Sequence, residues 1–137
     1  MENGKLFEKD FPGSIFVATD VRKEADVANL VKYIRRNFHQ LDVLVNNAST
    51  ISNAEGDIQN FNIDEVKDIF ETNVYSVFFT VKYTGNLLIQ NKGAIVNIAS
   101  GTALEPMAQV PIYGASKAAV VSLTGSTALI FAKHGYV

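Results

Sequence analysis

Three short runs of apolar residues alternate along the chain with longer segments in which apolar residues recur every three or four positions. The short continuous runs are typical of strands buried in a parallel sheet, and they predict strands over residues 15–19, 41–45 and 94–99. The segments with helical spacing predict helices over residues 24–38, 62–88 and 113–133. Because strands and helices alternate, we expect an α/β fold of three β-α units around a parallel sheet with right-handed crossovers.

Turn-forming and capping residues mark the ends of these segments. Asn62, followed three residues later by Glu65, predicts a helix start with a capping box. Lys92 and Gly93 predict the end of that helix, near residue 88, while Gly56 and Asp57 predict a turn within a loop over residues 49–60. Residues 1–14 are polar and close with a turn, and residues 101–111 form a loop rich in small residues.

The helices predicted over residues 62–88 and 113–133 are apolar around most of their circumference. Such helices are buried, either in a core or against another subunit. We therefore expect each of these two helices to be buried in one of these two ways.

Polar side chains follow each predicted strand at its carboxyl end. Asp20 follows the first strand, Asn46 and Asn47 follow the second, and Ser100 follows the third. In parallel α/β sheets the ligand site lies at this edge, and the helix that starts near Tyr113 begins on the same side. The chain is therefore expected to have one ligand site, built from these strand ends.

Tyr113 and Lys117 are four residues apart, so they share one face of the predicted helix. A nearby ammonium stabilises the phenolate, which makes the tyrosine a usable acid and base near neutral pH. Together with Ser100, this pair suits the transfer of a proton to a carbonyl oxygen. The hydride would have to come from a nicotinamide cofactor, because no side chain can supply it.

Each of these residues also has an ordinary structural interpretation. Tyrosine and lysine at this spacing are frequent on exposed helices, and Ser100 alone could be a turn residue. Asn73 lies within a predicted helix, where asparagine is mildly unfavourable, and it could be a packed amide capped by a water. The convergence at one edge of the sheet favours the catalytic interpretation.

Composition narrows the class of function. The 137 residues are enough for one domain with its own core, with 47% hydrophobic and 19% charged residues, as in folded soluble proteins. The net charge of −2 makes nucleic acid and anionic membranes improbable partners. The N-terminus does not resemble a signal peptide and no apolar run reaches transmembrane length, so a cytoplasmic location is expected.

Metal and hydrolytic chemistry have little support. The chain has no cysteine, and its histidines, His39 and His134, lie near the ends of predicted helices, so no metal site is expected. A serine hydrolase is disfavoured because the segment before Ser100 lacks the first glycine of a nucleophile elbow.

The chain resembles the short-chain dehydrogenase/reductase family over nearly its whole length. The motifs that carry the resemblance are Asp20 with Val21 after a strand, Asn46-Asn47-Ala48, Asn73, the strand that ends at Ser100, and Tyr113-Gly-Ala-Ser-Lys117. The resemblance implies a three-layer Rossmann-type parallel sheet, of which this chain holds family strands 3, 4 and 5. Ser49 stands where the family usually has glycine.

The resemblance also implies roles for these residues. Tyr113 is the catalytic acid/base, and Lys117 activates it and holds the nicotinamide ribose. Ser100 positions the substrate oxygen, and Asn73 supports a water-linked proton relay. Asp20 contacts the adenine, Val21 also belongs to the cofactor-binding residues, and Asn46, Asn47 and Ala48 flank the cofactor.

The expected protein is therefore an NAD(P)-dependent oxidoreductase of small alcohols or ketones. The choice between NAD and NADP stays open, and the helices near residues 63–88 and 113–133 are the expected surfaces of a homo-oligomer. Loop residues that could line a small, mostly apolar substrate pocket are Ile51, Ser52, Ala103, Leu104, Met107 and Val110.

The 137 residues lack the glycine-rich turn that holds the cofactor pyrophosphate in the family, and the later strands, so a single partial domain over residues 1–137 is expected. The family order places two strands between strands 3 and 4. Residues 15–19 must then close onto residues 41–45 or leave an unpaired edge. An alternative function follows: a catalytically incompetent fragment, or an interaction module that pairs through its helices.

Overall fold

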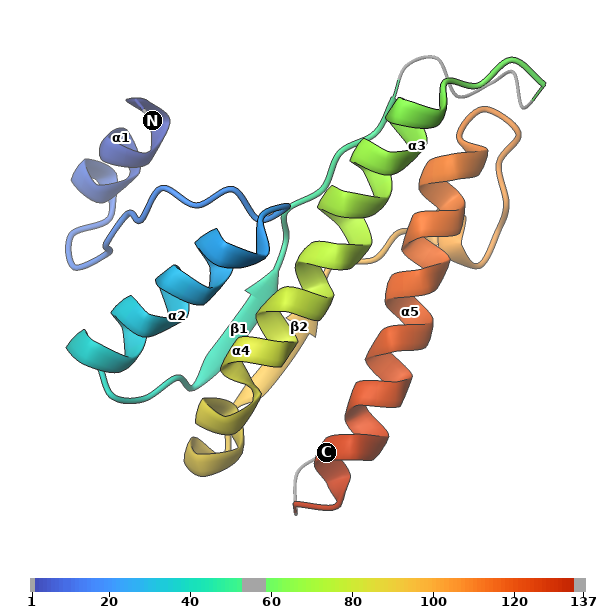
Figure 1. Ribbon diagram of the computed structural model, residues 1–137. Helices are drawn as coiled ribbons and strands as arrows, with labels where there is room; N and C mark the ends of the chain where they lie inside the picture. Colours follow the sequence, from blue (N-terminus) through green and yellow to red (C-terminus); the bar gives the residue numbers. More distant parts are fainter. Residues whose placement is uncertain (1, 53–58, 135–137) are drawn as a thin grey trace.

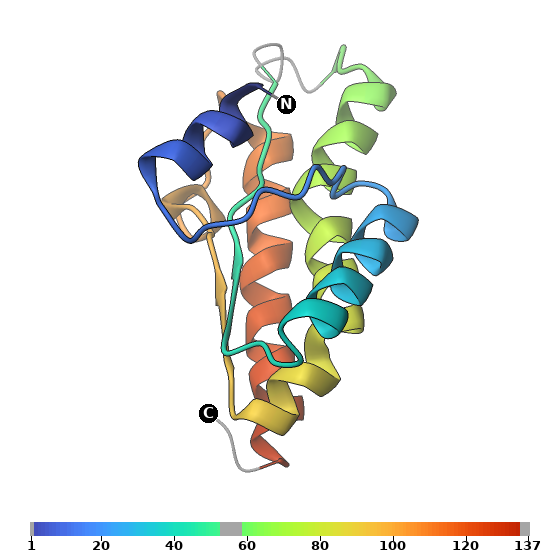
Figure 2. The same ribbon diagram turned by 90° about the vertical axis from the view of Figure 1, so that its left-hand side faces the viewer.

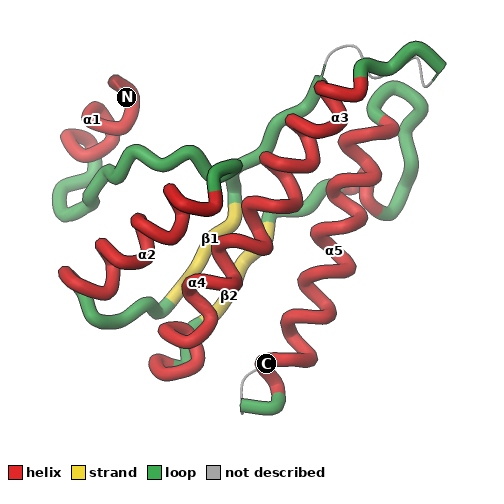
Figure 3. Tube along the Cα trace, viewed as in Figure 1, coloured by secondary structure: helices red, strands yellow, loops and turns green. Residues whose placement is uncertain are grey.

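The computed structural model describes residues 2–52 and 59–134, so the turn predicted at Gly56 and Asp57 lies outside the described residues. Five α-helices and two strands make up most of this part of the chain (Figures 1 and 3). The elements are α1 (Glu2–Asp10), α2 (Glu24–Asn37), β1 (Val43–Asn46), α3 (Ile63–Phe70), α4 (Ser76–Asn91), β2 (Ala94–Asn97) and α5 (Pro111–Ala132). A π-helical turn, Glu71–Tyr75, joins α3 to α4, and a short 3-10 helix, Gly101–Ala103, follows β2.

The strands β1 and β2 pair in parallel, with Val43 opposite Ala94 and Asn46 opposite Asn97. The helices α4 and α5 pack on β1 and β2, and α2 lies along α4. Figure 2 shows the sheet edge-on, with α2, α4 and α5 on the same side of it. In the described residues, the sheet and these three helices thus form two of the layers of the predicted three-layer arrangement.

The other face of the sheet is apolar and open. Side chains alternate along a strand, so those of every second residue point away from the helices. Exposed fractions on this face are 52% for Val43, 55% for Val45, 44% for Val96 and 43% for Ile98. A contiguous apolar surface of this kind is typical of a face that contacts other protein segments.

The predicted strand over residues 15–19 is wrong. The segment is extended, but among the described residues it pairs with neither strand, and the sheet has only the order β1-β2. A hollow lies between this segment and α2, lined by Ile15, Phe16 and Val17 on one side and by Tyr33, Ile34 and Phe38 on the other. An apolar run needs a neighbouring strand for its hydrogen bonds, and here the free edge of β1 stays unpaired within the described residues.

The predicted helix over residues 62–88 is confirmed as a continuous helical rod with an irregular middle. Asn62 caps it, because its Oδ1 accepts a hydrogen bond from the Asp64 amide at 2.9 Å. Glu65 does not complete the predicted capping box; its Oε2 instead accepts from the Ser52 hydroxyl at 3.1 Å. The rod continues to Asn91, slightly beyond the predicted end.

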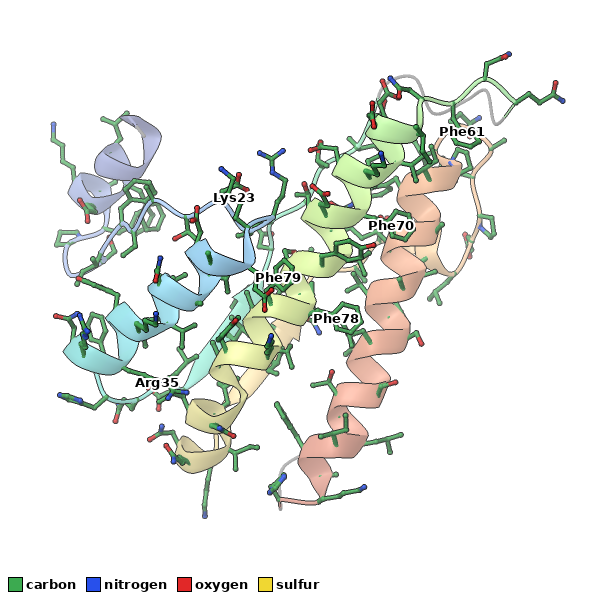
Figure 4. All side chains as sticks on the ribbon, viewed as in Figure 1. Lys23, Arg35, Phe61, Phe70, Phe78 and Phe79 are labelled. Carbon is green, nitrogen blue, oxygen red and sulfur yellow. The ribbon has the colours of Figure 1, made fainter. Side chains whose placement is uncertain are left out.

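The core lies where α4 and α5 meet each other, α2 and the sheet. Its buried apolar side chains include Val27, Val31, Ile69, Leu88 and Val120. Figure 4 shows Phe70 on the side of the α3 ribbon that faces α5. Across the surface, Lys82 Nζ and the Tyr83 hydroxyl both donate to Glu24 Oε1, at 2.6 and 3.0 Å, and so link α4 to α2.

The helix α5 remains largely apolar outside the core, as predicted. Val121, Leu129 and Ile130 are 39%, 73% and 56% exposed. By length and composition alone, α5 is also apolar enough to cross a membrane. Core helices share this length and composition, and one side of α5 is packed against the π-helical turn and the sheet.

Gly93 occupies the tightest position in the turn between α4 and β2. A Cβ at this position would lie 2.7 Å from the Asp42 carbonyl oxygen and 2.7 Å from Leu88 Cδ2. We therefore expect Gly93→Ala to lower the free energy of unfolding by about 1–3 kcal/mol, measured by urea denaturation.

Gly125→Ala is the matched control for this substitution. A Cβ at Gly125, inside α5, meets no atom within 4 Å. Alanine has the higher helix propensity, so the control should raise the free energy of unfolding by about 0.5–1 kcal/mol. Equal stability of the two variants would contradict the close approach at Gly93.

Candidate active site

The candidate site lies at the carboxyl ends of β1 and β2, where the first turns of α5 approach the sheet. The amide of Ile98 donates to the Asn46 carbonyl at 3.0 Å, so the segments that follow β1 and β2 remain paired at the ends of these strands. The 3-10 helix after β2 packs against α5. Gly114 permits this approach, since a Cβ there would lie 3.2 Å from the Thr102 carbonyl oxygen.

Lys117 is buried beneath this edge and lies beside Tyr113. Its side chain is only 2% exposed, and Nζ donates to the Ile98 carbonyl at 2.8 Å. The same Nζ is 5.6 Å from the centroid of the half-buried Tyr113 ring. Burial lowers the pKa of Lys117, because desolvation disfavours the charged ammonium. A buried ammonium next to a phenol is an arrangement that can move a proton.

Ser100 follows β2 and begins the short 3-10 helix. Its Oγ accepts hydrogen bonds from the Thr102 amide at 3.3 Å and from the Thr102 hydroxyl at 2.9 Å. Accepting these bonds leaves the hydroxyl proton of Ser100 available for donation. Ser100 is therefore a turn residue, as its structural interpretation predicted, and its hydroxyl can also donate a hydrogen bond to a substrate oxygen. Thr102 could not be recognised from the sequence, because it is an ordinary residue of a predicted loop.

Asn73 is 1% exposed and lies in the middle of the π-helical turn. Its Oδ1 accepts from the Thr50 amide at 2.8 Å, while Nδ2 donates to the Thr50 carbonyl at 2.9 Å and to Ser116 Oγ at 2.9 Å. Asn73 is thus a packed amide whose hydrogen-bond partners are protein groups. Thr50 and Ser116 were not recognised from the sequence.

Asp20 lies at the turn before α2, and Arg22 holds its carboxylate. Arg22 donates to Asp20 through Nε and NH2, both at 3.0 Å, and through its amide at 3.1 Å. These hydrogen bonds lower the pKa of Asp20 to about 2, so the carboxylate is ionised at neutral pH. Arg22 NH1 also donates to Asp68 of α3 at 2.7 Å, which fixes the turn against that helix. Val21 beside it is half-buried.

Asn46 directs its side chain toward the helices. Its Nδ2 donates to Asn97 Oδ1 at 2.7 Å, and its Oδ1 accepts from the Thr80 hydroxyl at 2.8 Å. Asn97 in turn donates to Thr124 of α5 at 2.9 Å. This network joins α4, both strands and α5. Asn47 and Ala48, in contrast, are exposed beyond the end of β1.

The predicted substrate-pocket residues divide between two hollows. Ala103, Met107 and Val110 line one against the first turns of α5, whereas Ile51 and Ser52 line another beside α3. Leu104 is 77% exposed. Within the described residues, these six side chains therefore do not line a single pocket.

Sequence and structure comparisons agree with this fold and arrangement. The family model for short chain dehydrogenase matches residues 6–137. Over 123 residues the chain is 34% identical to xanthoxin dehydrogenase of Arabidopsis thaliana, covering 89% of this chain and 43% of that protein. It is 35% identical over 123 residues to 3-beta-hydroxysteroid dehydrogenase of Comamonas testosteroni, covering 90% and 48%.

Solved structures show the same likeness. The structure of ElxO with NADP bound superposes with a TM-score of 0.90 at 31% identity, covering 98% of this chain and 56% of that one. NAD+-bound xylitol dehydrogenase gives 0.80 at 29% identity, covering 86% and 45%. The chain spans about half the length of the curated relatives it matches. As its motifs predicted, the chain belongs to the short-chain dehydrogenase family, with an α/β fold of the Rossmann type.

Proposed function

We propose that this chain carries the acid/base half of an NAD(P)-dependent oxidoreductase that acts on an alcohol or ketone, with Tyr113 as acid/base. The observation that carries the proposal is the buried ammonium of Lys117 beside the Tyr113 ring, at the carboxyl end of β2. Among its relatives are dehydrogenases named for hydroxysteroid and sugar-alcohol substrates, which supports the reaction class.

The residues at the site fit the nicotinamide side of such a cofactor. Lys117 has three donors, and one of them is bonded to the Ile98 carbonyl, which leaves two donors for ribose hydroxyls. Asn47 and Ala48 present small or polar groups at the end of β1, and the ionised Asp20 can accept from an adenine amino group. Asn46, by contrast, would act through its network with Asn97 and Thr80.

In the proposed reduction, each residue has one task. A bound nicotinamide would supply the hydride to the carbonyl carbon. Tyr113 gives its phenolic proton to the carbonyl oxygen, while Ser100 donates a hydrogen bond to that oxygen. Lys117 stabilises the phenolate that remains, and the proton is later replaced through a water relay near Asn73. Oxidation of the alcohol follows the same steps in reverse.

We also propose that copies of the chain associate through the outer faces of α4 and α5. Apolar side chains remain exposed there, including Phe78 on α4, Tyr75 at the end of the π-helical turn before it, and Leu129 and Ile130 on α5. Burying such a surface releases water from apolar area and favours association. The same surface supports the alternative function, a helix-mediated interaction module without catalysis.

Titration with reduced cofactor tests the proposed function. NADH or NADPH, added up to millimolar concentration, should bind the chain, and binding should change the fluorescence of the cofactor. The cofactor that binds with the higher affinity is the one that the protein uses. A Lys117→Met variant should bind more weakly, because it loses the ribose donors. A chain that binds neither cofactor but self-associates in light scattering would favour the interaction module.

A further inference from the structure

In the sequence of α5, a fully buried serine lies between Tyr113 and Lys117, the two residues proposed for acid/base chemistry. Ser116 is 0% exposed and precedes Lys117 in α5. Its Oγ donates to the Tyr113 carbonyl at 2.7 Å, one turn earlier in the helix. The same Oγ accepts from Asn73 Nδ2 at 2.9 Å, so it is bonded to a side chain 43 residues away.

Beyond Ser116, the contacts continue to the loop after β1. Asn73 binds both main-chain groups of Thr50, accepting from its amide and donating to its carbonyl, as a neighbouring strand would. Thr50 lies two residues after Ala48, within the loop that begins at the end of β1. A continuous series of hydrogen bonds thus runs from this loop through Asn73 and Ser116 to the main chain of Tyr113.

The π-helical turn makes this series possible. Glu71–Tyr75 widens the rod at the position of Asn73, and such turns are rare and frequently lie at functional sites. Asn73 and Ser116 are both almost completely buried, so neither can exchange its partner for water. Displacement of either side chain would leave a buried polar group unpaired. The loop and the first turn of α5 are therefore held in one relative position.

We propose that Ser116 is a positioning residue that, through Asn73, fixes the loop after β1 against the first turn of α5. Its catalytic consequence rests on the proposed function: the loop borders the cofactor and the helix carries Tyr113, so Ser116 sets the distance between them. Ser116 itself touches neither the substrate nor the cofactor.

Hydrogen exchange at the Thr50 amide tests the contact without turnover. In the chain as it stands, Ser116→Ala should speed exchange at Thr50 about 10-fold, because Asn73 loses the partner that steadies its side chain. Asn73→Ala should have at least this effect, and Ser116→Thr, which keeps the hydroxyl, should restore slow exchange. An unchanged Thr50 rate in Ser116→Ala would overturn the proposal.

Ser76→Ala is the matched control. Ser76 is also buried, at 4% exposure, and its hydroxyl also donates to a carbonyl one turn earlier, that of Thr72. Its loss should leave exchange at Thr50 unchanged. Equal acceleration in this control would mean that any buried helical serine has the effect, which overturns a specific role for Ser116.

The catalytic part is tested separately in the cofactor-loaded enzyme. Ser116→Ala should lower kcat about 10-fold while the KM for the cofactor stays within about 2-fold, as expected when reacting groups are misplaced rather than lost. Faster exchange at Thr50 with unchanged kcat would overturn the positioning role. Full activity of Tyr113→Phe would instead reject the proposed function and leave the exchange result standing.

Discussion

Tyr113→Phe should abolish turnover while the protein stays folded. The substitution removes only the phenolic hydroxyl, and with it the proton that the carbonyl oxygen needs. General acid/base catalysis contributes about 10²–10⁴ in rate, so kcat should fall by at least about 100-fold. The half-buried ring remains in place beside Lys117, and the far-ultraviolet circular dichroism should match that of the wild type.

Tyr75→Phe is the matched control for this loss. Tyr75 is 49% exposed and is the last residue of the π-helical turn. The control should keep full turnover. Activity that survives in Tyr113→Phe, measured by absorbance of the reduced cofactor, would mean that another group is the acid/base.

Lys117→Met should remove activity without a comparable loss of stability. The ammonium is almost completely buried, and desolvation lowers the pKa of Lys117, so the charged form opposes folding at neutral pH. Methionine fills a similar volume without this cost, although the Ile98 carbonyl loses a donor. The two effects oppose each other, and we expect the free energy of unfolding to change by less than about 2 kcal/mol.

The expected loss of turnover in Lys117→Met is again about 100-fold or more, because the phenolate loses its stabilising charge. Lys133→Met, at the exposed end of the same helix, is the control and should leave both turnover and stability unchanged. A severe loss of stability in Lys117→Met alone would show that the ammonium is chiefly structural.

The sequence predicted best those elements that depend on residues close together in the chain. The apolar runs at residues 41–45 and 94–99 became β1 and β2, and the three long helices lie within a few residues of their predicted bounds. The run at residues 15–19 is also short and mostly apolar, yet it is not a strand. Strand formation depends on a neighbour, and the identity of that neighbour is not a property of the run itself.

The partners of the candidate site residues could not be predicted in the same way. Tyr113, Lys117, Ser100 and Asn73 carry the family motifs, but their hydrogen bonds connect residues that are distant in the sequence. The Asn73–Ser116 bond spans 43 residues, and the Asn73–Thr50 bonds span 23. The π-helical turn that aims Asn73 inward has no distinct apolar spacing, because residues 70–79 are apolar on most sides.

The parallel pairing of β1 with β2 has a consequence for how the chain folds. Asn46 and Asn97 face each other although 51 residues separate them, so the sheet cannot form from a local hairpin. The α3–α4 rod connects β1 to β2 and packs back against β1, so pairing of the strands requires the chain to close over the whole rod. The entropy of closing so long a loop must be lost before strand pairing contributes, so we expect the docking of this rod to limit the rate of folding.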